Sequence, residues 1–173
     1  MIFRFQYKLQ KNKKHARLTS GDKYIVINVF LLDYHTRLRA WYNLRENLKE
    51  ADLQTICIEV DRFWQQCPIS AHYLHPADVV DWPNPWELIS DNDYCCYARA
   101  LGMIYTLMLL GVKDIDFVTA TDYNSNDVVL VLVDNVKYVL NWYPNSVLNT
   151  TLSDFTNIKK IDITSLTQKI GKE

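Results

Sequence analysis

The sequence predicts an α+β domain in which N-terminal helices and one buried central helix pack on a small antiparallel sheet. In residues 94–110 only Arg99 and Thr106 are plainly polar, as expected for a helix that is covered on every side. A run of Val and Leu over residues 128–133 precedes an Asp-Asn pair at 134–135, which is typical of a tight turn between antiparallel strands. The first third of the chain shows helical spacing of its apolar residues, so the helices come before the sheet.

Length and composition indicate one globular domain. The chain has 173 residues, 49% of them hydrophobic, and a domain of this size buries roughly two thirds of its unfolded surface. We expect one domain over 1–173, made of an extended or basic N-terminal arm (1–20), a mainly helical part (21–81), the central helix with the sheet (82–165) and a tail (166–173).

The charge balance argues against a general nucleic-acid or anionic-membrane binder. The net charge is −1, whereas both of those functions need a positive field. Residues 8–17 carry five Lys and Arg residues and no acid. We interpret this stretch as a solvated arm, with a local binding patch as the alternative.

The four cysteines show neither C-x-x-C spacing nor a neighbouring histidine cluster; they are Cys57, Cys67, Cys95 and Cys96. We therefore expect no zinc site, no other metal, no disulfide framework and no cofactor. Reduced thiols and the absence of a signal-peptide pattern indicate a cytoplasmic protein. The longest apolar stretch, 101–112, is too short to span a membrane.

The N-terminal half is expected to be mainly helical. Residues 2–9 alternate between apolar and polar and predict a strand or an extended arm. Residues 24–32 fit a strand or a helix, and we favour a helix that continues through 33–49. Asp52 is expected to cap the next helix, which should stop near Cys67 because a proline follows.

The C-terminal half contains the central helix and the strands. Residues 69–85 are expected to form a loop, and Asp91 or Asp93 to cap the central helix, with Gly111 as its left-handed C-cap. The pattern after the central helix predicts four strands, at 115–120, 128–133, 136–142 and 157–163. Residues 169–173 are expected to fray.

Three segments in this order resemble bacterial transglutaminase-like cysteine proteinases, within the transglutaminase and papain-like group. They are the proline-rich 82–86 (Trp-Pro-Asn-Pro-Trp), the helix start 93–98 (Asp-Tyr-Cys-Cys-Tyr-Ala) and the hairpin end 140–142 (Leu-Asn-Trp). The resemblance covers about a third of the chain. It implies a papain or transglutaminase-like fold.

The resemblance also implies where a catalytic triad would lie. In that family a cysteine starts the central helix, a histidine begins a Val/Leu-rich strand, and an aspartate ends the next strand. When the sequences are aligned on Tyr97 and Ala98, these positions fall on Tyr94, Asp127 and Asn141. The resemblance thus predicts a degenerate triad.

A shift of one residue would make Cys95 the nucleophile. It leaves the general base missing, because all four histidines precede the cysteines; they are His15, His35, His72 and His75. His72 or His75 could approach Cys95 only in a rearranged site. The simpler interpretation is that Cys95 and Cys96 are small packing residues.

We therefore expect a non-catalytic scaffold protein with a binding or assembly role, whose partners are other proteins in a homo- or hetero-assembly. Small chains rich in Trp and Tyr are common among tailed-phage proteins, which suggests a virion or accessory protein in the virion or the host cytoplasm. The alternative is a thiol hydrolase or acyltransferase that uses Cys95 with a non-standard base. A third hypothesis is a small-molecule or peptide binder. The candidate binding residues are Trp82, Trp86, Tyr94, Asp127 and Asn141.

Overall fold

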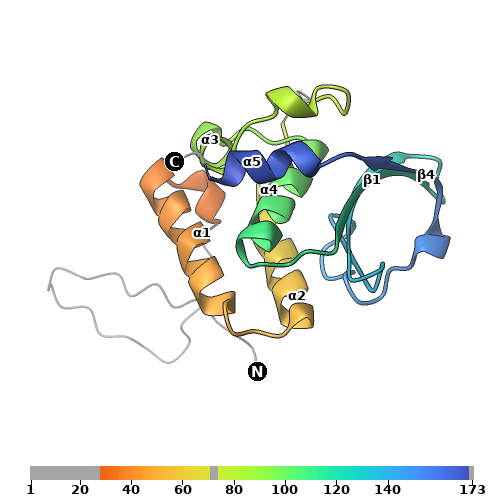
Figure 1. The fold of residues 1–173 in the computed structure, drawn as a ribbon, viewed down its shortest axis with the longest axis horizontal. Helices are drawn as coiled ribbons and strands as arrows, with labels where there is room; N and C mark the ends of the chain where they lie inside the picture. Colours follow the sequence, from red (N-terminus) through yellow and green to blue (C-terminus); the bar gives the residue numbers. More distant parts are fainter. Residues whose placement is uncertain (1–27, 71–73, 172–173) are drawn as a thin grey trace, which may run out of the picture.

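The computed structural model describes residues 28–70 and 74–171, and it has a helical half beside a four-stranded antiparallel sheet (Figure 1). The helices are α1 (Tyr34–Leu48), α2 (Leu53–Trp64), α3 (Pro85–Asp91), α4 (Cys96–Leu109) and α5 (Thr167–Ile170). The strands are β1 (Ile115–Asp122), β2 (Asp127–Val133), β3 (Tyr138–Leu140) and β4 (Phe155–Ile161). The α+β prediction is confirmed, whereas the predicted N-terminal strand or arm lies outside the described residues.

Two aspartates set the starts of the first helices. Asp52 caps α2 by accepting a hydrogen bond from the Thr55 amide at 2.8 Å, which confirms the prediction. Asp33 caps α1 in the same way. The predicted continuous helix is wrong over residues 29–33, because a 3₁₀ turn, Val29–Leu31, precedes the Asp33 cap; residues 24–27 of this prediction lie outside the described residues.

Helix α3 was not expected from the sequence. Asn84 Oδ1 accepts hydrogen bonds from the amides of Trp86 and Glu87, and the Glu87 carboxylate accepts one from the Asn84 amide. Pro85 occupies the first helical position, where it needs no amide partner. Asn92, with φ of 54°, ends the helix.

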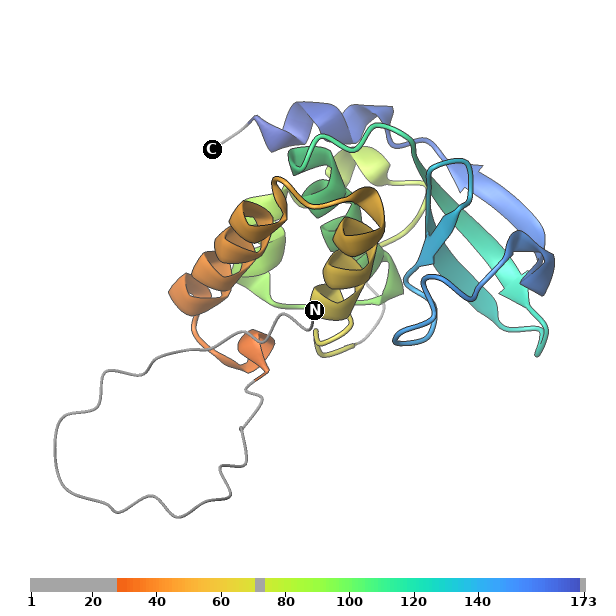
Figure 2. The ribbon, with the colours of Figure 1, turned by 90° about the horizontal axis from the view of Figure 1, so that it is seen from below.

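Helix α4 lies beside α2 and next to the sheet, and α1 lies on the side away from the sheet (Figures 1 and 2). Residues 100–107 are all buried, so this part of the helix is covered on every side as predicted, whereas Cys96 at its first position is exposed. Gly111, with φ of 81°, follows it as predicted. The predicted cap is wrong: Asp91 is the last residue of α3, and the residue before α4 is Cys95.

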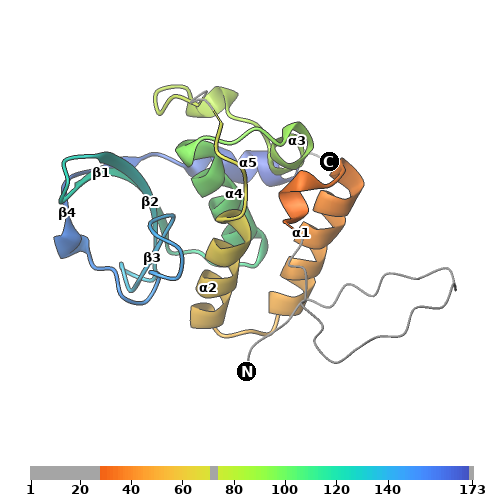
Figure 3. The same cartoon turned by 180° about the vertical axis from the view of Figure 1, so that it is seen from behind.

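The sheet has the order β3-β2-β1-β4 and two apolar faces. The β2 side chains alternate between two cores: Val129, Val131 and Val133 face the large core around α4, and Leu130 and Leu132 face a smaller core. This confirms that the valine-rich strand is covered on both faces. The sheet curves, and the connection between β3 and β4 runs round the side of the smaller core (Figure 3).

The bounds of the last two strands and the structure of the C-terminal residues were predicted less well. β3 is shorter than the predicted 136–142 because residues 134–136 all have positive φ, and β4 begins two residues earlier than predicted. The last residues form α5, preceded by the fully buried Leu166, where a tail was expected. Among the described residues no helix has the length and apolar character needed to cross a membrane.

Candidate functional site

The candidate site lies where the N-terminal end of α4 meets the end of β3. Asn141 directly follows β3 and has φ of 66°, a left-handed conformation that asparagine tolerates better than most residues. Its backbone amide donates a hydrogen bond of 2.9 Å to Asp61 Oδ1 on α2. One residue therefore joins the sheet to the helical half.

The side chain of Asn141 is bonded on both sides of its amide group. Nδ2 donates to the Val129 carbonyl at 2.7 Å and to the Cys96 carbonyl at 3.2 Å. Oδ1 accepts from Arg99 Nε at 2.5 Å. Both Asn141 donors are used, and its acceptor faces a guanidinium cation, so the side chain fastens α4 to the sheet.

Asp61 completes this arrangement from α2. Its carboxyl group is buried, and Gln65 Nε2 donates to Asp61 Oδ1 and to the Trp142 carbonyl, at 3.3 and 3.1 Å. Burial raises the pKa of Asp61, although its hydrogen bonds and the nearby Arg99 charge act in the opposite direction. We call Asp61, Gln65, Arg99 and Asn141 the junction network.

Tyr94, at the expected nucleophile position, lies elsewhere. It is fully buried, and its hydroxyl donates to the Leu88 carbonyl at 3.1 Å. Its ring packs edge-on against Phe30 and Trp64, with centroid distances of 5.4 and 5.9 Å. This environment is the core of the helical half.

Asp127 is exposed at the first position of β2. Burial raises the pKa of the half-buried Tyr97 hydroxyl, and the charge of Asp127 adds to the shift. The structure therefore places Asp127 near Tyr97 and Asn141 beside Cys96, with Tyr94 packed in the helical core.

The cysteines differ in their access to solvent. Cys95 is buried, with 2% of its surface accessible, whereas Cys96 is exposed at the first position of α4. Burial raises the pKa of both Cys57 and Cys67 to about 12. The thiol that reaches solvent is thus that of Cys96, whereas the enzyme hypothesis drawn from the sequence used Cys95.

The two tryptophans of the proline-rich segment pack inward to different degrees. Trp82 is 3% exposed; its Nε1 donates to the His75 carbonyl at 3.0 Å, and its ring packs against Phe117. Trp86 is half-buried and meets the Trp41 ring edge-on, 5.4 Å between centroids. Trp82 therefore seals the core and offers no face to a partner.

The described histidines do not complete a triad. His75 Nδ1 accepts from the Ala77 amide, and the His35 ring packs near Tyr34 on α1. His15 and His72 lie outside the described residues. Within the part of the chain that the structure describes, no cluster of three or more His, Cys, Asp or Glu residues could hold a metal ion.

The arrangement of helices and sheet is found in a solved structure. The chain is similar to LapG of Legionella pneumophila, a transglutaminase-like cysteine protease, with a TM-score of 0.59 and 20% sequence identity over 73% of this chain and 71% of LapG. This chain has a transglutaminase-like fold. No protein-family model matches the sequence, and neither does any curated protein.

Within this transglutaminase-like fold, sequence reasoning missed most of the junction network. Arg99 was visible as a charge in an apolar helix, three residues after Cys96 and hence on the same helix face. Asp61 was visible as an acid next to the apolar positions Val60 and Trp64. Neither signal indicates Asn141 as the common partner, because that contact joins residues 42 and 80 positions apart.

Proposed function

We propose that this protein is a non-catalytic transglutaminase-like scaffold with a binding or assembly role. The observation that carries the proposal is the bonding of Asn141. At the position where the resembling family has its aspartate, this side chain is committed to Arg99, Cys96 and Val129. A triad instead needs that group to orient an imidazole, and Asn141 Oδ1 faces a cation that cannot act as a base.

Two hollows of the described surface give no support to a small ligand at the candidate residues. The hollows, of about 360 and 480 Å³, lie beside the start of α2 and between α1 and α5. Neither hollow is lined by Tyr94, Asp127 or Asn141. A small molecule recognised by these three residues is therefore the weaker hypothesis.

A thiol hydrolase or acyltransferase is the second candidate, and one observation favours it. Cys96 is exposed at the first position of a 14-residue helix, where backbone amides and the helix dipole stabilise a thiolate. The base for such an enzyme would have to come from a group other than His35 or His75 as they are placed here. This version of the enzyme hypothesis uses Cys96, not Cys95.

The two candidates differ in how fast the Cys96 thiol reacts at low pH. The measurement is the rate of alkylation of the folded protein by iodoacetamide from pH 5 to pH 9, located by mass spectrometry. A scaffold predicts that Cys96 labels no faster than a cysteine in an unstructured peptide at the same pH. Labelling of Cys96 that is much faster than that of the peptide at pH 5 would overturn the scaffold proposal and support the enzyme.

Cys95→Ser and Cys96→Ser are matched controls for this experiment because the two positions are adjacent. We expect Cys96→Ser to abolish labelling and Cys95→Ser to leave it unchanged. Cys57 and Cys67, with pKa values raised to about 12, should remain unmodified until the chain unfolds.

The finer assignment, a tailed-phage virion or accessory protein in the virion or host cytoplasm, is supported by composition alone. Its test is an antibody against the protein applied to purified virions of the phage that encodes it. Signal that stays with intact particles through a density gradient supports a virion component, and signal confined to the lysate contradicts it.

A further inference from the structure

Two exposed tyrosines lie together at one end of the sheet. Tyr123, in the turn between β1 and β2, is 72% exposed, and Tyr143, shortly after β3, is 51% exposed. The Tyr143 ring lies 4.4 Å from the ring of half-buried Trp142, between centroids, and the neighbouring Tyr123 hydroxyl raises the pKa of Tyr143. We call Tyr123, Trp142 and Tyr143 the tyrosine patch.

The surroundings of this patch are acidic. Three aspartates lie at the end of the sheet that carries Tyr123, because Asp127 pairs with Thr121 and Asp122 pairs with Phe155, which follows Asp154. The other aspartates of the sheet lie at its opposite end, where Lys160 pairs with Asp116 and Lys137 with Asp134. Asp122 lies near Tyr143, and Asp127 is exposed at the end of the same turn. Because the faces of tyrosine rings also attract cations, the patch fits a basic partner that has little need of a deep pocket.

The chain itself contains such a partner. Residues 1–27 hold seven Lys and Arg residues and one aspartate, a net charge of 7 − 1 = +6, and the stretch 8–17 is entirely without acids. The opposite charges of the two regions favour association. The residues before this stretch include Phe3, Phe5 and Tyr7, and aromatic residues are enriched in interfaces.

The described chain begins close to the patch. Asn28 Nδ2 donates to the Gln66 carbonyl at 2.7 Å, and the adjacent Gln65 donates to the Trp142 carbonyl at 3.1 Å. Asn28, where the described structure begins, is therefore linked to Trp142 through the adjacent residues Gln65 and Gln66. An extended stretch of ten residues spans about 33 Å, so the basic stretch can reach the patch, and such a short tether makes its effective concentration high.

We propose that the tyrosine patch is a docking surface for the basic stretch 8–17 of this chain's own N-terminal segment. The basic side chains stack on the Tyr123 and Tyr143 rings and face the acidic turn between β1 and β2. The docked segment lies beside Cys96, because Asn141 joins Trp142 to the Cys96 carbonyl. This inference does not depend on whether the scaffold is catalytic.

Limited trypsin digestion of the full-length protein tests the docking, because the segment contains cleavage sites at Lys11, Lys13, Lys14 and Arg17. The readout is the rate at which N-terminal peptides are released, measured by mass spectrometry. We expect the double variant Tyr123→Ser and Tyr143→Ser to release them about fivefold faster than the unmodified chain, since cleavage follows the population of the undocked segment. Asp127→Asn should produce a smaller increase of the same sign.

Matched variants control for general effects. Tyr42→Ser removes a tyrosine that is 52% exposed on α1, and Glu50→Gln removes an exposed acid away from the sheet. Both should leave the release rate unchanged, and the urea midpoints of all variants should match that of the unmodified chain.

Equal release rates in the patch and control variants would overturn the proposal. Protection of the N-terminal segment from trypsin that grows with protein concentration would also overturn the proposal. The patch would then be occupied by the segment of a second copy. Protection independent of concentration, lost in the patch variants and weakened by salt, supports docking within one chain.

Discussion

The middle of α4 and its N-terminal end are held by different kinds of interaction. In the middle, Thr106 Oγ1 accepts from the indoles of Trp41 and Trp64, at 2.8 and 2.9 Å, and donates to the Gly102 carbonyl at 2.7 Å. At the N-terminal end, half-buried Arg99 donates a hydrogen bond to the side-chain amide oxygen of Asn141, beside the exposed thiol of Cys96. The middle therefore sets where the helix lies, and the end is the part where a partner or reagent can act.

Removing the Thr106 hydroxyl should have the largest effect. Thr106→Val leaves two buried indole N–H groups without an acceptor, at about 2 kcal/mol each, so we expect a loss of about 4 kcal/mol in the free energy of unfolding. Urea denaturation measures this loss. Thr106→Ser, which keeps the hydroxyl and removes one methyl group, should lose only about 1 kcal/mol. Equal losses in the two variants would show that packing, not the hydroxyl, stabilises the middle of the helix.

Adding a methyl group at Gly102 should have the next largest effect. A Cβ at this position would lie 2.5 Å from the Trp64 ring, which its own hydrogen bond holds in place. We expect Gly102→Ala to lower the free energy of unfolding by about 3 kcal/mol through overpacking. At Gly111 nothing lies within 4 Å, so Gly111→Ala should lose only the ~1 kcal/mol of its left-handed backbone. If Gly102→Ala lowers the free energy of unfolding by no more than Gly111→Ala does, the Trp64 ring can move aside at little cost.

At the N-terminal end of α4, the contribution of Asp61 to the free energy of unfolding should depend on pH. Burial raises its pKa above the unfolded value near 3.9, so its favourable contribution is complete below that value and is lost as pH rises through the folded pKa. Asp61→Asn keeps the Oδ1 acceptor for Asn141 and Gln65 but cannot ionise. We expect it to be more stable than the unmodified chain at pH 7, with the difference vanishing toward pH 4.

The measurement for Asp61 is the difference between urea denaturation curves of the two proteins from pH 4 to pH 7. A difference for Asp61→Asn that grows toward low pH would contradict the assigned direction of the pKa shift.

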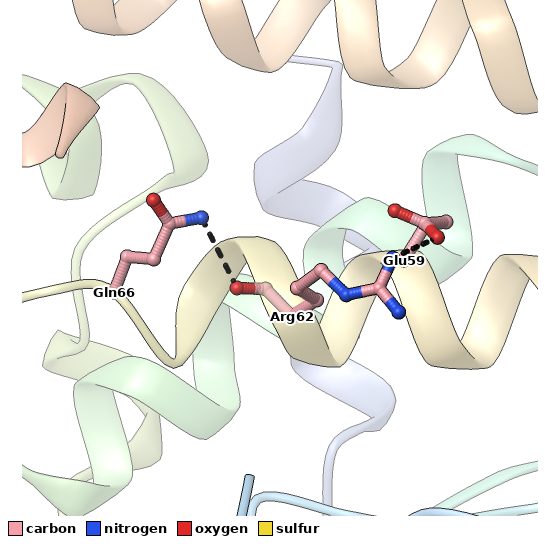
Figure 4. A network of polar contacts seen from close by, with 3 residues as sticks. All are labelled: Glu59, Arg62 and Gln66. Carbon is pink, nitrogen blue, oxygen red and sulfur yellow. Dashed lines mark hydrogen bonds and ion pairs between the residues drawn. The ribbon is translucent and has the colours of Figure 1, made fainter. Parts of the chain in front are cut away.

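The smallest effect is expected on the exposed face of α2. Arg62 pairs there with Glu59, and its carbonyl accepts from Gln66 Nε2 at 3.2 Å (Figure 4). Because surface ion pairs contribute little, Arg62→Ala should change the free energy of unfolding by less than about 0.5 kcal/mol. A larger loss in urea denaturation would mean that charges near α2 stabilise the junction network more than its geometry indicates.

Local patterns predicted most of the elements. The Asp52 cap, the apolar α4, the Gly111 C-cap and the covered β2 strand were all readable because each depends on residues close in the chain. Helix α3 was missed because its prolines resemble a loop, although its Asn84 and Glu87 form a capping box. The start of α4 was misplaced because Cys95 occupies the cap position without the usual polar side chain.

The candidate site could be predicted only in part. Alignment with the resembling family drew attention to Asn141, and the structure places it at the junction of α2, α4 and the sheet. Tyr94 and Asp127 were chosen by the same alignment, yet one lies in the core and the other on the surface. Spacing along a chain indicates which residues share an element; it does not indicate which way the loop before a helix turns its side chains.

The sequence alone determined the class of fold, because the period of apolar residues selects helix or strand, and turn residues such as Gly111 separate them. The tertiary structure decided which thiol reaches solvent, which polar groups meet at Asn141, and that Thr106 serves two tryptophans. The contacts of Asn141 with α2 and α4, and those of Thr106 with the two tryptophans, join residues 42 to 80 positions apart. Their geometry follows from how the helices and the sheet pack around α4, and no local pattern contains that information.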